Sequence, residues 1–193
     1  MSGWWLALLL VVVLVVGLWL TWTANRLDRM HHRIDVARGT LDAQLLRRSG
    51  ATLELASSEV LDPPSRLVLL DAANHARNAG PDEFEAAESD LSQALRAVFA
   101  HPADVRHLCE DAAVEPLVDE LARDCARVEL ARRFHNDVVV SARALRSRRR
   151  VRWLRLAGHA GDLRAVDLDD VPPDALVRTE RSGSDWGGRP SAS

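Results

Sequence analysis

An unbroken apolar run near the start of the chain constrains the fold more than any other feature of the sequence. Its residues are WWLALLLVVVLVVGLWLTW, from Trp4 to Trp22, and none of them is charged. A helix of about 20 apolar residues spans the ~30 Å hydrocarbon layer of a bilayer. Tryptophans stand at both ends of the run, where interfacial aromatic side chains are favoured: Trp4, Trp5, Trp19 and Trp22. The run predicts a transmembrane anchor over residues 1–23, with the lipid bilayer as its partner.

A cleaved signal peptide is the competing interpretation of this run. Three features favour an anchor, because no basic residue precedes the run, its apolar core exceeds the usual ~7–15 residues, and bulky Trp22 occupies the nearest cleavage position. Four arginines follow the run closely: Arg26, Arg29, Arg33 and Arg38. The positive-inside rule therefore predicts a single-pass protein of the cell membrane, with its N-terminus outside and the chain after residue 23 in the cytoplasm.

The chain beyond the anchor is long enough for one domain with an apolar core. Its formal net charge of −3 argues against a general nucleic-acid binder, so no nucleic acid is expected as a partner. Cys109 and Cys125 form neither a CxxC motif nor a zinc-ligand spacing. They are interpreted as reduced cysteines packed as small apolar residues. A disulfide between them becomes an alternative if the topology is inverted.

Apolar residues recur at steps of three and four along most of the remaining chain, which predicts helices and no strands. The first helix continues from the anchor to about Val60. Proline-containing breaks separate it from helices expected over residues 64–78, 81–98 and 114–146, with a partly helical connector before the last. Such helices bury their apolar faces on one another. The predicted fold class is therefore all-α, a transmembrane helix continuing into an antiparallel bundle of about four helices over residues 24–160.

Two further expectations concern this bundle and its end. A parallel dimeric coiled coil is the alternative arrangement, which the repeated proline breaks disfavour, and the sequence leaves the oligomeric state open. Beyond about Leu163 the composition shifts to Asp, Gly, Ser and Pro. This shift predicts a disordered tail over residues 161–193.

Several blocks of the chain resemble the LemA family of bacterial membrane proteins. They are the N-terminal apolar anchor, Asn25-Arg26-Leu27, Ile34-Asp35, Leu41-Asp42-Ala43-Gln44-Leu45-Leu46-Arg47-Arg48, Leu91-Ser92-Gln93-Ala94-Leu95 and Ala131-Arg132-Arg133-Phe134-His135-Asn136-Asp137-Val138-Val139. The resemblance covers most of residues 1–160. It implies a long antiparallel helical bundle in the cytoplasm, behind an N-terminus outside, in a family whose biochemical function is not settled. Two departures are His135, where tyrosine is common, and an arginine-rich stretch in place of the usual Phe-Pro ending.

This arginine-rich stretch is the candidate contact with lipid or with a partner. Its residues are Arg146, Arg148, Arg149, Arg150, Arg152, Trp153 and Arg155, interleaved with apolar residues. A basic amphipathic segment with an aromatic residue is typical of binding to anionic lipid, where each arginine contributes about 1 kcal/mol. An ordinary solvated helix end and a patch for nucleic acid or an acidic partner are the alternatives.

The sequence offers no convergent set of catalytic groups. His135, Asn136 and Asp137 are adjacent on a helix and point about 100° apart, and His31 with Asp35 lacks the further ligands that a metal needs. His135 is interpreted as a polar core residue beside Phe134. No motif for a metal or cofactor occurs, so neither is expected. The predicted role is a non-enzymatic scaffold or adaptor with an unknown protein partner; a membrane-surface sensor that binds anionic lipid through residues 146–156 is the alternative.

Overall fold

A computed structural model describes residues 3–146 and 164–177 of the chain, without the side chains of residues 6, 7, 20, 23–31, 145 and 146. The chain divides into two compact units. The first contains Met1–Arg38 and Asn136–Ala165, and the second contains Gly39–His135 and Val166–Ser193. Each unit combines two segments that are distant in sequence, whereas the domains expected from the sequence are continuous segments with boundaries after residues 23 and 160.

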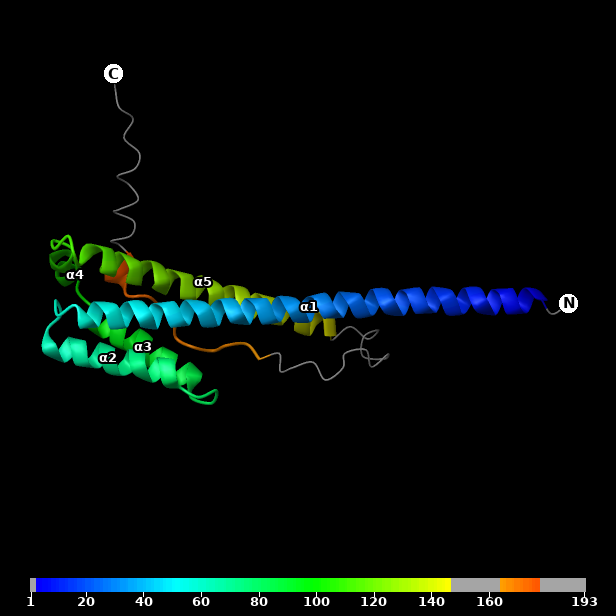
Figure 1. Cartoon of the computed structure of the whole chain (residues 1–193), viewed down its shortest axis with the longest axis horizontal. Coiled ribbons are helices and arrows are strands. Elements are labelled where there is room, and N and C mark those ends of the chain that lie inside the picture. Colours follow the sequence, from blue (N-terminus) through cyan, green and yellow to red (C-terminus); the bar gives the residue numbers. More distant parts are fainter. Residues whose placement is uncertain (1–2, 147–163, 178–193) are drawn as a thin grey trace, which may run out of the picture. The chain divides into compact units, whose positions relative to one another are not determined.

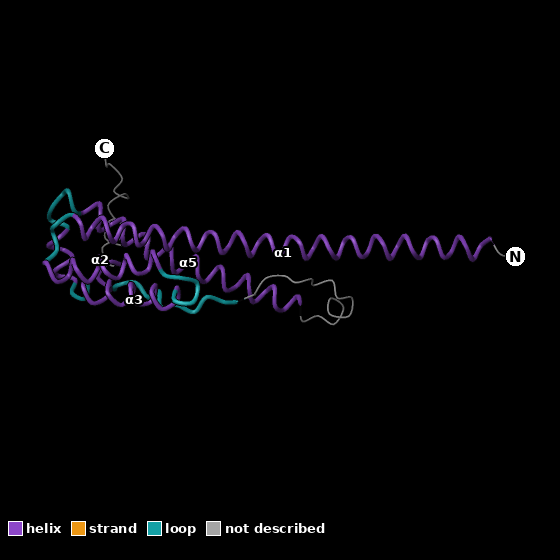
Figure 2. The backbone as a smooth tube through the Cα atoms, turned by 60° about the horizontal axis from the view of Figure 1, so that its bottom comes forward, coloured by secondary structure: helices purple, strands orange, loops and turns teal. Residues whose placement is uncertain are grey.

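The helices occur in the order that the apolar periodicity predicts (Figure 1). They are α1 (Gly3–Ser57), α2 (Pro63–Asn78), α3 (Phe84–Val98), α4 (Pro102–Leu108) and α5 (Glu115–Arg146). A single helical turn follows at residues 174–177. The rest of the described chain is turn and loop, and no strand occurs in residues 3–146 or 164–177 (Figure 2). The prediction of an all-α fold is confirmed.

Local sequence sets the helix ends. The Asp62 carboxylate accepts a hydrogen bond of 3.1 Å from the backbone N–H of Ser65, and proline occupies the first turn of α2. Such a side-chain cap satisfies one of the free N–H groups at a helix start. Hydrogen bonds from the side chain and then the backbone of Ser65 hold the pKa of the Asp62 carboxyl below its usual value of 3.8. Just beyond α1, Glu59 adopts a φ of 62°, a left-handed conformation that stops the helix.

The second unit is a helical bundle. Within it, the last part of α1, then α2, α3 and the first part of α5 alternate in direction along the chain (Figure 1). Their apolar faces form one core, to which α4 adds Val105; its large members include Leu55, Leu69, Leu91, Leu95, Phe99 and Leu121. Burial of each such side chain contributes about 1.5–3 kcal/mol. Cys125 lies in this core and Cys109 packs against it, both as free thiols.

The first unit has a small core and a large exposed apolar surface. Ile34 of α1 packs against Val139 and Ala142 of α5. By contrast, the large apolar side chains described between Trp4 and Trp22 are 41% to 68% exposed. Over the described residues, which omit the side chains at 6, 7 and 20, no helix has the length and apolarity needed to cross a membrane.

The end of the chain departs most from expectation. The prediction of disorder over residues 161–193 is wrong for residues 164–177, which we call the strap. Four of its apolar side chains are at most 6% exposed. Ala175 and Leu176 belong to the main core of the second unit, and Val166 and Leu168 belong to a second buried cluster of that unit. The apolar residues among the aspartates and prolines bury enough surface to order this segment. The remainder of the predicted tail lies outside the described residues.

Candidate functional site

The structure describes only part of the sites expected from sequence. The predicted anchor tryptophans are all exposed, and the rings of Trp4 and Trp5 lie 4.4 Å apart between centroids. Arg146 is the last residue of α5, but its side chain is not described. The rest of the arginine-rich stretch lies outside the described residues, so its contact with lipid stays a prediction: Arg148, Arg149, Arg150, Arg152, Trp153 and Arg155.

Of the histidines considered for catalysis, His135 has a described side chain and His31 does not. His135 is 1% exposed, which confirms its interpretation as a core residue, whereas the neighbouring Phe134 is 51% exposed. Asp137 is exposed and Asn136 is half-buried. Among the described side chains, no three His, Cys, Asp or Glu residues gather in a way that could hold a metal ion.

A buried ion pair crosses the second unit from α1 to α3. The Arg48 side chain is 2% exposed and its Nη2 lies 2.6 Å from Oε2 of Glu88, which is 4% exposed. Arg48 also donates 2.8 Å to the Ser92 hydroxyl and 3.1 Å to the Glu88 backbone carbonyl. These three acceptors replace part of the hydration that the guanidinium loses on burial. Burial raises the pKa of the Glu88 carboxyl, and Arg48 offsets part of that rise.

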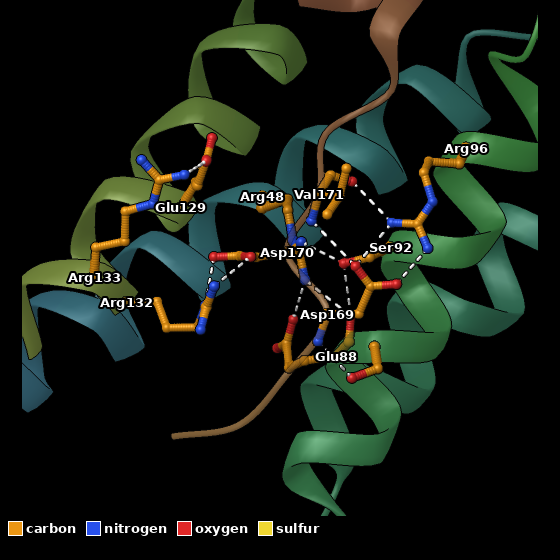
Figure 3. Close-up of polar contacts among 11 residues, drawn as sticks. Arg48, Glu88, Ser92, Arg96, Glu129, Arg132, Arg133, Asp169, Asp170 and Val171 are labelled. Carbon is orange, nitrogen blue, oxygen red and sulfur yellow. Dashed lines mark hydrogen bonds and ion pairs between the residues drawn. The ribbon is translucent and has the colours of Figure 1, made fainter. Parts of the chain in front are cut away.

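Two further arginines hold the strap from either side (Figure 3). Arg96 of α3 donates from both terminal nitrogens to the Asp169 carboxylate, and one of them also donates 2.9 Å to the Val171 carbonyl. Arg132 of α5 binds Asp170 through Nε at 2.5 Å and Nη2 at 2.8 Å. Such two-pronged guanidinium–carboxylate pairs fix direction as well as distance. They therefore hold consecutive aspartates of the strap toward opposite helices.

Apolar and backbone contacts complete the site. Val166 and Leu168 share a buried cluster with residues of α1 and α5: Leu41, Leu45, Val128 and Ala131. The Asp169 backbone N–H donates 3.0 Å to the Ser89 hydroxyl of α3. We call Ser89, Arg96, Arg132 and these four apolar residues the strap site. The site thus recognises alternating apolar residues followed by two carboxylates.

The charges of the strap site stabilise one another. Hydrogen bonds from Arg96 hold the pKa of Asp169 below its usual value of 3.8, with a smaller contribution from the charge of Arg48. The bond to Asp170 raises the pKa of the Arg132 guanidinium. The Asp169 carboxylate is therefore bound in its ionised form at neutral pH.

The lowered pKa of Asp169 predicts a pH-dependent contribution to stability. A carboxyl with a lower pKa in the folded state binds fewer protons there, so its contribution is complete above about pH 4 and is lost as the pH falls through the lowered pKa. We expect the stability difference between the wild type and Asp169→Asn to stay constant from about pH 6 to pH 4 and to shrink as the pH falls further. Urea unfolding at several pH values measures it, and a difference independent of pH would contradict the Arg96 pair.

Sequence reasoning missed the strap because its aspartates and prolines suggested a solvated tail. One signal was present, since Val166, Leu168 and Asp170 alternate with other residues and are all buried, as is typical of a non-helical segment with one buried face. The partners of this face were not visible in the sequence. Arg96 and Asp169, for example, are 73 positions apart.

A second, shallower surface lies on α1 and α5 of the same unit. It is a hollow of about 430 Å³ lined by Thr40, Gln44, Arg127, Leu130, Ala131 and Phe134. Leu130 and Phe134 are 70% and 51% exposed, one helical turn apart. This hollow is apolar but carries no charge pattern comparable to that of the strap site.

Comparison with known proteins adds no relative. No family model, no curated protein and no solved structure matches this chain. The resemblance to the LemA family therefore stays a prediction, based on the residue blocks of the sequence alone.

Proposed function

We propose that this chain is a membrane-anchored adaptor or scaffold at the cytoplasmic face of the cell membrane, which acts by binding a protein partner and not by catalysis. The observation that carries the proposal is the strap site. There, two arginines and an apolar cluster hold a non-helical acidic segment, Val166–Val171. Pairs of arginines beside apolar positions are a common means of recognising acidic peptides.

The apolar surface of α1 supports the anchor. Exposed apolar side chains are continuous around the helix from Leu8 to Val16, and soluble monomers rarely expose contiguous apolar patches beyond a few hundred Å². In the sequence, apolar residues also fill the intervening positions up to Trp22. An anchor of this kind would raise the concentration of the bundle at the inner leaflet, which increases the occupancy of a partner held there.

Cysteine labelling in intact cells tests the proposed topology. Cys109 and Cys125 are replaced by alanine and Ser191→Cys is introduced, with Ser2→Cys as the matched variant at the other end. A membrane-impermeant maleimide should label the Ser191→Cys variant only after lysis, and the Ser2→Cys variant in whole cells. Labelling of Ser191→Cys in whole cells would overturn the cytoplasmic location.

A further inference from the structure

We infer that the strap site binds an acidic segment of a partner protein, of the pattern apolar-x-apolar-acid-acid, and that residues 166–171 of the chain occupy the site until this segment displaces them. The inference rests on the proposed adaptor function and names the surface and the partner chemistry that the adaptor uses. Three observations on the second unit carry it.

The first observation is the way in which residues 166–171 are held. They form no helix, and Arg96 and Ser89 of α3 and Arg132 of α5 bind the two aspartates. Apolar burial is confined to alternate positions, Val166 and Leu168, ahead of the two aspartates. A segment bound through a short local pattern of this kind is held as a peptide ligand would be, so another chain with the same pattern can make the same contacts.

The second observation is the pair of arginines, Arg96 and Arg132, that residues 166–171 cover. Within the described chain, the hydrogen bonds recorded for the Arg96 and Arg132 guanidiniums all go to the strap. Their displacement would expose two cations beside an apolar cluster, a surface complementary to an acidic segment with apolar residues. This charge complementarity identifies the partner as an acidic segment.

The third observation is that the strap has two separable parts. Pro172 and Pro173 divide residues 166–171 from the helical turn 174–177, whose Leu176 is fully buried in the main core. Both side chains of the Arg96–Asp169 pair are about one-third exposed, whereas in the second pair Arg132 is 23% and Asp170 5% exposed. Residues 166–171 can therefore leave their site while the turn stays packed and the main core stays covered.

The test uses the full-length chain in mild detergent and a fluorescent peptide with the sequence of residues 164–171, Arg-Ala-Val-Asp-Leu-Asp-Asp-Val. In the wild type the peptide competes with a strap that is present at an effective concentration on the order of millimolar. The variant Asp169→Asn/Asp170→Asn weakens the strap but keeps its apolar residues and both arginines. We expect fluorescence anisotropy to show at least about tenfold tighter peptide binding to this variant than to the wild type, because the competitor has lost both charge pairs.

Two controls separate the strap site from other surfaces. A peptide with asparagine in place of Asp169 and Asp170 should bind the weakened variant at least about tenfold more weakly than the acidic peptide. Adding Arg96→Gln and Arg132→Gln to the weakened variant should abolish the difference between the two peptides. Circular dichroism checks the helix content of each variant, and Asp169→Asn alone serves the same test if the double variant fails to fold.

Three results would overturn the inference. The first is equal binding of the peptide to the wild type and the weakened variant, and the second is equal binding of the two peptides to the weakened variant. The third is exchange of the strap between two copies of the chain, seen as a concentration-dependent dimer that the peptide dissociates. These failures are distinguishable from failure of the proposed function. If the Ser191→Cys variant is labelled only after lysis but the weakened variant does not bind the peptide, the proposed topology stands and the inference about the strap site fails. If the Ser191→Cys variant is labelled in whole cells, the cytoplasmic location fails, whatever the result with the peptide.

Discussion

We expect Arg48→Met to lower the free energy of unfolding by about 3–5 kcal/mol, the usual cost of removing one partner of a buried ion pair. Arg48 is 1% exposed, and its loss leaves the Glu88 carboxylate buried without its cation. Because Arg48 lowers the pKa of Glu88 against the effect of burial, that pKa should rise further in the variant. The loss of stability should therefore shrink as the pH falls and Glu88 takes up a proton. Urea unfolding followed by circular dichroism measures both effects.

The neighbouring residue supplies the matched control for this prediction. Arg47 is exposed, so Arg47→Met should change stability by no more than about 0.5 kcal/mol. The double variant Arg48→Met/Glu88→Leu replaces the pair by apolar side chains and should recover most of the loss. If Arg48→Met and Arg47→Met destabilise equally, the buried pair contributes nothing measurable to the fold.

We expect Leu176→Ala to lower the free energy of unfolding by about 2–5 kcal/mol, as for other leucines removed from a packed core. Leu176 is fully buried among residues of the main core, although the sequence around it suggested a solvated tail. Truncation to alanine removes apolar contacts and leaves a cavity that the surrounding helices fill only in part. Thermal and urea unfolding of the full-length chain measure the cost.

Val171→Ala is the control within the same segment. Val171 is 58% exposed, so its truncation should change stability by no more than about 0.5 kcal/mol. If Leu176→Ala also lowers the free energy of unfolding by no more than about 0.5 kcal/mol, the helical turn 174–177 is not part of the core in solution. That result would favour the disordered tail expected from the sequence.

The helices were accessible from the sequence because their signals are local. The periodicity of three and four, Asp62-Pro63-Pro64 and Gly80-Pro81 depend on neighbours within a few positions, and α2 begins within one residue of the prediction. Periodicity also places Arg48 on the same face as Leu41 and Leu55, seven positions away on either side. The burial of Arg48 was thus within reach of sequence reasoning, whereas the identity of Glu88 as its partner was not.

The strap could not be predicted in the same way. Its composition resembles a solvated tail, and its order depends on Arg96 and Arg132, which precede Asp169 and Asp170 by 73 and 38 positions. A segment of this length gains little from its own neighbours, since it forms one helical turn and no repeating backbone bonds. Its stability comes from surfaces that exist only after α3 and α5 have packed.

The sequence by itself determined the helices, their ends and which face of each helix is apolar, because these follow from spacing, capping and proline chemistry within a few residues. Only the tertiary structure decided that Arg48 faces Glu88 and that two arginines from different helices converge on consecutive aspartates. These choices involve residues tens of positions apart, whose approach is settled by the packing of whole helices and not by any pattern along the chain.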